Sequence, residues 1–213
     1  MIILQHTINN MMLAAGQHQS WFMSDLQNIC DGHLWRLSIR GWIAGGAVRR
    51  TLMGEPLRDV DIFFRNSDAF NEANRALSAI DHIAKPLPGT PRRSAWLLKH
   101  HPDRKPIKLD LVSAQTFPDV ETLLSDFDFT CCQFALDLMN CETVYHTPFA
   151  LAHTLQRRLV VANENKLRLS LAHMERYMRE GWSADERALE ILLSYGKEAR
   201  QAVHDAAGYS GIV

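Results

Sequence analysis

Apolar and polar residues alternate between residues 41 and 64 in a way that predicts a strand, a glycine turn, a short helix and a second strand. The first strand is expected over 39–44, and two glycines then lead into the helix-prone segment 47–53. In a strand, every second side chain faces the same side of the sheet. The second strand therefore has one apolar face and one face that carries Asp59 and Asp61.

The same periodicities predict the other elements of the first 148 residues. Helices are expected at 11–15, 21–29, 67–80 and 119–124, strands at 94–99, 107–112 and 144–146, and a proline-glycine turn at 85–90. The strand over 107–112 resembles the aspartate strand, because Leu109 and Leu111 share one face while Asp110 lies on the other.

The pattern changes near Pro148, after which glycine and β-branched residues become rare. Three helices are predicted there, at 149–161, 165–179 and 184–207, and the last has a capping box formed by Ser183 and Glu186. The chain is therefore expected to consist of an α+β part, 1–148, with a mixed sheet flanked by helices, and a helical part, 149–213.

Composition narrows the class of protein. The 213 residues have a formal net charge of −1, so any contact with nucleic acid has to be local. The four cysteines have no zinc-ligand spacing and are interpreted as reduced thiols. No apolar run is long enough to span a membrane, and the first ten residues lack the pattern of a signal peptide. We therefore expect a cytoplasmic protein without a membrane partner.

The two neighbouring aspartates predict a metal site. Two carboxylates side by side repel each other and lose solvation when buried, and a divalent cation removes that cost. Upstream, Gly45 and Gly46 leave bare backbone before a helix, and Arg49 and Arg50 provide guanidinium groups for phosphate oxygens. Each feature alone is common in ordinary turns and strands. Together with Asp110 they indicate metal-dependent phosphoryl transfer, without the sequence of a Walker A loop or of a dinucleotide-binding turn.

The order of these motifs resembles the polymerase-β-type nucleotidyltransferase superfamily, and within it the head domain of CCA-adding tRNA nucleotidyltransferases and bacterial poly(A) polymerases. The similarity covers roughly residues 39–182 and is most specific in GGAVR, residues 45–49, and in RDVDI, residues 58–62. The segments FDFT, ENKLR and RY…GW, which begin at 127, 164 and 176, resemble more degenerate blocks of that family. Arg50 and Asn165 depart from it, since both stand where the family has aspartate.

The resemblance implies a two-metal mechanism. Asp59, Asp61 and Asp110 would be the catalytic and metal-binding residues for two Mg²⁺ ions. Gly45, Gly46 and Arg49 would hold the triphosphate, with Arg50 beside it. Three further residues would contact the base of the NTP: Glu164, Asn165 and Arg168. A solvated helix face is the alternative reading of those last three.

The acceptor is left open by the sequence. The family likeness favours an RNA 3′ end such as that of tRNA, and the basic segment 92–108, with Trp96 inside it, could contact such RNA. A solvated hairpin explains the same segment equally well. The chain ends where that family's RNA-binding body would begin. The alternatives are transfer to a protein or small-molecule hydroxyl, and a non-catalytic nucleotide-binding or regulatory module.

Overall fold

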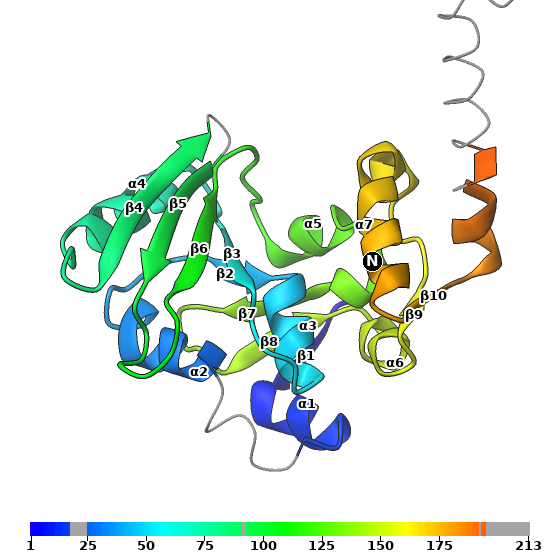
Figure 1. Cartoon of the computed structure of the whole chain (residues 1–213), viewed down its shortest axis with the longest axis horizontal. Helices are drawn as coiled ribbons and strands as arrows, with labels where there is room; N and C mark the ends of the chain where they lie inside the picture. The colour runs from blue at the N-terminus through cyan, green and yellow to red at the C-terminus, as the bar shows by residue number, and fades with distance from the viewer. Residues whose placement is uncertain (18–24, 91–92, 192, 195–213) are drawn as a thin grey trace, which may run out of the picture.

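A mixed β-sheet forms the centre of the first part of the chain (Figure 1). The computed structural model describes residues 1–17, 25–90, 93–191 and 193–194, and within this part it leaves the side chains of 167–171 undescribed. The eight strands of this sheet run in the order β1-β8-β7-β2-β3-β6-β5-β4. Their bounds are β1 Leu4–Thr7, β2 Trp42–Ala44, β3 Asp59–Phe63, β4 Ala84–Thr90, β5 Arg93–Leu98, β6 Ile107–Val112, β7 Phe134–Asp137 and β8 Thr143–His146. The predicted α+β class with a mixed sheet is confirmed.

Helices and short turns connect the strands. They are α1 Ile8–Ala14, α2 Asp25–Ile29, a π-helical turn η2 Cys30–Leu34, α3 Gly46–Leu52, α4 Ser67–Ser78, α5 Val120–Ser125 and a 3₁₀ turn η3 Thr130–Cys132. The helix α4 is capped by Asn66, whose side-chain oxygen accepts a hydrogen bond from the Ala69 amide at 2.9 Å.

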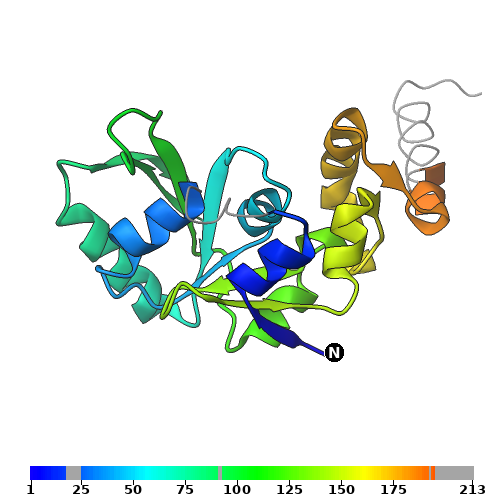
Figure 2. The ribbon, with the colours of Figure 1, turned by 90° about the horizontal axis from the view of Figure 1, so that it is seen from below.

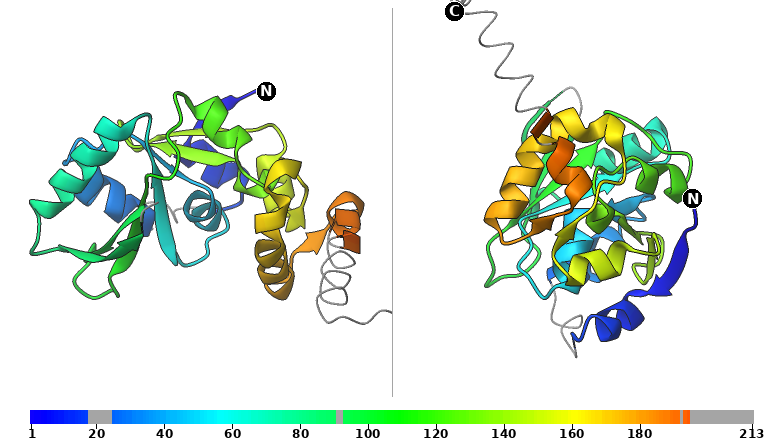
Figure 3. Two further views of the ribbon diagram at one scale, coloured as in Figure 1. Left: turned by 90° about the horizontal axis from the view of Figure 1, so that it is seen from above. Right: turned by 90° about the vertical axis from the view of Figure 1, so that its right-hand side faces the viewer.

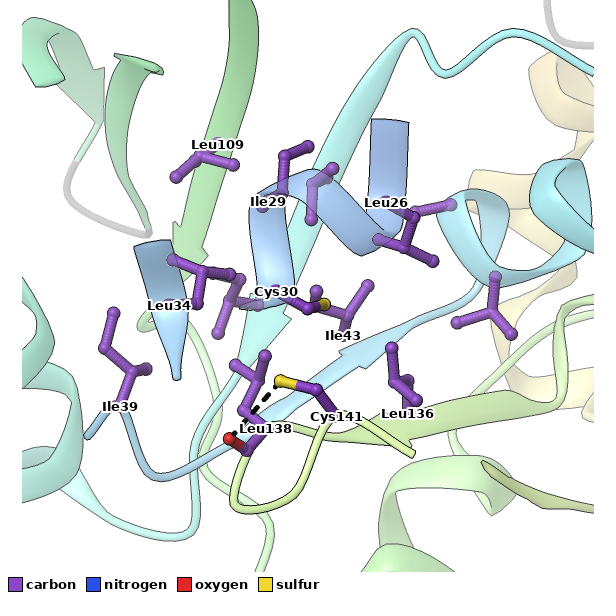
Figure 4. Packing of buried hydrophobic residues seen from close by; sticks show 14 of the residues in the cluster. Leu26, Ile29, Cys30, Leu34, Ile39, Ile43, Leu109, Leu136, Leu138 and Cys141 are labelled. Atoms are coloured by element: carbon purple, nitrogen blue, oxygen red, sulfur yellow. Dashed lines mark hydrogen bonds between the residues drawn. The ribbon is translucent and has the colours of Figure 1, made fainter. Parts of the chain in front are cut away.

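The larger core lies between one face of the sheet and the helices α1 to α4 (Figure 2). The apolar sides of β3 and β6 contribute Val60, Ile62, Leu109 and Leu111, so the predicted alternation is confirmed. Figure 4 shows the part of this core in which α2 and η2 pack on the sheet, close to Cys141. The opposite face of the sheet has its own smaller cluster under α5. Asp59 and Asp61 belong to that opposite face.

The second part of the chain packs against one end of the sheet (Figures 1 and 3). It contains α6 Ala150–Leu155, β9 Arg158–Leu159, η4 Glu164–Lys166, α7 Leu167–Arg179 and β10 Ser183–Ala184. A separate apolar cluster joins it to the loop that precedes β7, because Phe129 and Cys131 pack with Met174, Tyr177 and Trp182. Residues on both sides of Pro148 thus share one core.

Several predicted elements were wrong. Residues 85–90 form the edge strand β4 instead of a turn, since proline is tolerated on an edge where its missing N–H faces no partner. Residues 4–7 form the strand β1, where the sequence pattern predicts no strand. The predicted helix 149–161 ends at Leu155, where Arg157 takes a positive φ of 49° and the chain enters β9.

The start of the last predicted helix also differs. Its cap is Asp185, whose side chain accepts from the Ala188 amide at 2.8 Å, and not the expected pair of Ser183 and Glu186. The end of that helix, up to residue 207, and the start of the predicted helix 21–29 lie outside the described residues.

The four cysteines, Cys30, Cys131, Cys132 and Cys141, are buried and free, as expected for reduced thiols. Among the helices that the structure describes, none has the length and apolarity required to cross a bilayer.

Candidate nucleotide and metal site

Two of the three predicted carboxylates lie opposite each other on neighbouring strands. β3 and β6 run parallel, and their register pairs Asp61 with Asp110 and Asp59 with Lys108. Because alternate residues share a face, Asp59 lies on the same side of β3 as Asp61. Asp110 is buried, Asp61 is half-buried and Asp59 is exposed. The strand pairing thus gathers all three acids at one place on the sheet.

Two cations contact the buried carboxylate of Asp110. The Nζ atom of Lys108 donates to Asp110 Oδ2 at 2.6 Å, and Nη1 of Arg93 donates to the same oxygen at 3.1 Å. The other oxygen, Oδ1, is buried and has no hydrogen-bond partner within the described part of the chain. A buried acceptor without a partner is costly, so Asp110 retains the capacity to bind one more donor or cation.

Asp61 has an unusual protonation equilibrium. Burial, together with the charges of Asp59 and Asp110, raises the pKa of Asp61 to about 7, although Lys108 and Arg93 act in the opposite direction. At neutral pH, without a cation, this carboxyl group therefore takes up a proton more readily than an ordinary aspartate. A divalent cation bound to these acids would oppose that shift, because it favours the charged carboxylate.

This pKa predicts how the stability of the metal-free protein depends on pH. The folded state holds the proton of Asp61 up to a pH of about 7, whereas the unfolded chain releases it near the ordinary aspartate pKa of 3.8. The stabilisation present below pH 4 is therefore lost as pH rises towards 8. We expect a loss of about 2 kcal/mol, after allowance for solvent screening at a half-buried group. Urea unfolding in EDTA at several pH values, compared with Asp61→Asn, measures it, and parallel pH profiles would contradict it.

The acids fit Mg²⁺ by the chemistry of their donors. Mg²⁺ prefers oxygen ligands, and carboxylates are the usual ones in proteins. The unpartnered Oδ1 of Asp110 and the raised pKa of Asp61 both indicate negative charge that lacks full compensation. As the side chains lie, no three His, Cys, Asp or Glu residues in the described ranges are arranged closely enough to hold a metal ion. Donor chemistry thus favours a metal here, while a ready-made cage is absent from these ranges.

The glycine turn lies beside the acids. Gly45 precedes α3 with φ of 74°, and a Cβ atom placed there would lie 3.0 Å from the ring of Phe127. A Cβ atom on Gly46 would instead meet only Arg49 Nη2, at 3.9 Å. Only the first glycine is required by the backbone and by its neighbour.

We therefore expect Gly45→Ala to destabilise the protein by about 1–3 kcal/mol, because alanine is strained at positive φ and crowds the Phe127 ring. Gly46→Ala is the matched control and should change stability by less than about 0.5 kcal/mol. Thermal unfolding of both variants measures the difference, and equal midpoints would contradict the assigned role of Gly45.

The guanidinium of Arg49 packs against the second part of the chain. It donates hydrogen bonds to Tyr177 Oη and, at 3.4 Å, to Cys132 Sγ. Its Cζ lies 4.7 Å from the ring centre of Tyr177 and 5.3 Å from that of Trp182. Both hydrogen bonds come from Nη1, and the buried Nε atom has no hydrogen-bond partner in the described part of the chain. Arg49 is thus held by the aromatic rings of the second part of the chain, and it also lines the cavity that contains the acids.

Arg50 is likewise engaged, in an ion-pair network. Its two terminal nitrogens contact Glu55 and Glu180, each at 3.3 Å. Arg58, directly before the aspartate pair, contacts Glu180 at 2.6 Å, and Arg157 contacts Glu55 at 2.7 Å. The network links the α3–β3 region to the end of α7.

These side chains surround a cavity of about 270 Å³. Its lining contains the predicted residues Gly45, Gly46, Arg49, Arg50, Asp59, Asp61 and Asp110, and in addition Arg58, Arg93, Phe127, Asp128, Cys132, His173, Arg176 and Tyr177. Part of the added lining comes from α7, where His173 Nδ1 lies 3.1 Å from Asp128 Oδ2. This contact raises the pKa of His173. Asp128 therefore lies at the cavity wall, in contact with His173.

Two of the three residues expected to contact the base, Glu164 and Asn165, do not line this cavity. Glu164 is exposed and pairs with Arg187 at 3.0 Å, and Asn165 is exposed. Neither lines the cavity. The side chain of Arg168 lies outside the described part. The residues of α7 that do line the cavity are His173, Arg176 and Tyr177, and the last two belong to the RY…GW segment that resembles the nucleotidyltransferase family.

The cations of the basic segment 92–108 contact acids in different parts of the chain. Arg93 and Lys108 contact Asp110, while Arg104 contacts Asp25, so these cations are partly neutralised. Trp96 is buried, and its indole N–H donates to Asn74 at 3.2 Å. It is therefore not available as a stacking platform for RNA bases.

The fold is that of known nucleotidyltransferases. A CCA-adding enzyme in complex with ATP superposes with a TM-score of 0.62 at 15% identity, covering 93% of this chain and 46% of that one. The Thermotoga maritima CCA-adding enzyme complexed with tRNA gives a TM-score of 0.58 at 14% identity, covering 93% and 47%. At these identities the likeness establishes the fold, which agrees with the resemblance seen in the sequence.

Sequence comparison shows the family. Over 139 residues the chain is 27% identical to "Gabija anti-defense 2" of Bacillus phage SPbetaL7, which is 63% of this chain and 32% of that relative. The chain thus spans about a third of the length of the relative. The model of the Gabija anti-defense 2 family matches residues 16–157, a range that includes the glycine turn and all three acids. This chain belongs to the Gabija anti-defense 2 (Gad2) family.

Proposed function

We propose that this chain is a nucleotidyltransferase of the polymerase-β type, which moves a nucleoside monophosphate from an NTP to an acceptor hydroxyl and releases pyrophosphate. The observation that carries the proposal is the pairing of Asp61 with Asp110 on parallel strands, beside Asp59 and the Gly45 turn, in one cavity. The fold shared with CCA-adding enzymes, which bind ATP and CTP in their crystal structures, supports it.

The residues would divide the work as follows. Asp59, Asp61 and Asp110 would hold Mg²⁺, which when bound lowers the pKa of a hydroxyl and neutralises phosphate charge. Arg58, Arg93 and Arg176 line the same cavity and would bind phosphate oxygens, since guanidinium groups pair well with them. In the transfer, the acceptor oxygen bonds to the α-phosphorus, the bond from that phosphorus to the bridging oxygen breaks, and pyrophosphate leaves.

For the acceptor, we propose an RNA 3′ end such as that of tRNA, because one of the structures with this fold is a complex with tRNA. A protein or small-molecule hydroxyl is the alternative within the same chemistry. The relative's name describes an activity against Gabija, and we propose that transfer by this chain serves the same purpose. A cytoplasmic location is proposed as well, in agreement with the four free thiols.

One observation favours a second candidate, a nucleotide-binding module without turnover. The oxygen Oδ2 of Asp110 is already shared by Lys108 and Arg93, and the carboxylates form no ready metal cage in the described ranges. A domain of this kind could bind a nucleotide through its arginines alone.

The two candidates are separated by incubating the purified protein with labelled ATP, CTP, GTP and UTP, Mg²⁺ and candidate acceptors, including tRNA. The proposal predicts pyrophosphate release with at least one NTP and its loss in Asp110→Asn. Label on tRNA would identify the acceptor, whereas label on protein would select the alternative. Nucleotide binding without pyrophosphate release under every condition would favour the binding module.

A further inference from the structure

The contacts of Asp110 raise the question of how a metal ion could reach it. Lys108 precedes Asp110 by two residues on β6, so both side chains lie on one face of the strand, and the register places Lys108 opposite Asp59. Arg93, at the start of β5, approaches the same oxygen from the neighbouring strand. Two cations thus lie within the group of three acids.

Exposure differs sharply between these partners. The side chain of Asp110 is 2% exposed, whereas those of Lys108 and Arg93 are 35% and 47% exposed. The acid is therefore fixed in the sheet, while each cation reaches it at the end of a long side chain that remains partly in solvent. Long side chains of this kind can leave their partner with little change in the fold.

The charges explain why the cations lie there. A buried carboxylate needs compensation, and Asp61 stands directly opposite. Lys108 and Arg93 also act on Asp61 itself, where they lower a pKa that burial and the neighbouring acids raise. In the metal-free protein the two cations thus supply part of the positive charge that a divalent ion would bring.

We propose that Lys108 and Arg93 are positioning residues that hold Asp110 in the metal-free protein and compete with a divalent cation for it. This inference rests on the proposed function, since it concerns the metal of that site. The two cations weaken metal binding until they leave Asp110, and the triphosphate of an incoming NTP offers them a new anionic partner. Binding of the nucleotide would consequently raise the affinity for the metal ion, and binding of the metal ion would raise the affinity for the nucleotide.

A titration of the whole chain with Mn²⁺, without nucleotide, tests this inference. The EPR signal of the free ion reports how much Mn²⁺ remains unbound. Lys108→Met and Arg93→Gln are each expected to bind Mn²⁺ about tenfold more tightly than the wild type, because each removes a positive charge next to the ion. The control is Lys105→Met, which removes one charge from an exposed position in the loop between β5 and β6. It should change the affinity for Mn²⁺ by less than about twofold. Lys108→Arg should restore weak binding.

One further variant shows at which site the ion binds. Asp110→Asn in the Lys108→Met background should abolish the tight binding, which places the ion at this site. If Lys108→Met does not fold, Arg93→Gln alone decides, because its side chain is the more exposed of the two. Equal or weaker Mn²⁺ binding in the charge-removing variants would overturn the inference.

The inference and the proposed function fail in different ways. Pyrophosphate release by the wild type together with unchanged Mn²⁺ affinity in Lys108→Met would refute the competition and leave the transferase intact. Tighter Mn²⁺ binding in Lys108→Met without pyrophosphate release by any form would support the competition and remove the transferase.

Discussion

Replacing Asp61 with asparagine is expected to reduce nucleotidyl transfer by roughly a thousandfold or more while leaving the fold intact. Asp61 lies opposite Asp110 on the parallel strands, so the change removes a carboxylate from the middle of the acid group that we propose to hold the metal. Asparagine has nearly the same shape, so packing on β3 should persist. Pyrophosphate release at saturating NTP and Mg²⁺ measures the loss.

The control for this variant is Asp103→Asn, which neutralises an exposed acid in the loop before β6. It should retain wild-type turnover. Circular dichroism should show both variants folded, and in EDTA at pH 8 the Asp61 variant should unfold at a temperature no lower than the wild type, because the carboxylate it removes is destabilised by burial. Turnover within tenfold of the wild type would show that Asp61 is not a ligand of the reacting complex.

Truncating Arg49 to alanine should lower the free energy of unfolding by about 3 kcal/mol. The variant loses two ring contacts and two hydrogen bonds in the interior, and the hydroxyl of Tyr177 keeps only its contact with Cys132 Sγ. These contacts join α3 to α7 across the two parts of the chain. Urea unfolding followed by tryptophan fluorescence is the measurement, since Trp182 is one of the rings that Arg49 touches.

Arg179→Ala provides the comparison for Arg49. Its side chain is 79% exposed and makes an ion pair with Glu175 one turn earlier, so its removal should cost less than about 0.5 kcal/mol. A loss in Arg49→Ala no larger than in this control would mean that Arg49 does not hold the two parts together.

Local periodicity was sufficient to predict much of the site. The faces of β3 and β6 follow from alternation within a few residues, and this placed Asp59, Asp61 and Asp110 on the side away from the main core. The pairing of the two strands is long-range, and the direct opposition of Asp61 and Asp110 is seen only in the structure. The glycine turn could also be predicted, because glycine readily adopts the positive φ that Gly45 has in the structure.

The surroundings of the acids could not be predicted in the same way. Arg49 lies on the short helix where it was expected, but its guanidinium is directed by rings more than a hundred residues away. Lys108 and Arg93 belong to a basic segment of the sequence. The charge of that segment does not predict the strand pairing that brings both residues to Asp110. Glu164 followed a degenerate motif, and its partner Arg187 becomes visible only in the folded chain.

A crystal structure of the protein with a non-hydrolysable NTP analogue and Mn²⁺ tests the central claim most directly. We predict an anomalous Mn²⁺ peak between Asp61 and Asp110, in contact with phosphate oxygens of a nucleotide that lies beside Gly45. A nucleotide bound elsewhere, or one bound beside Gly45 with Lys108 and Arg93 still on Asp110 and no Mn²⁺ peak, would contradict a metal-dependent transferase site.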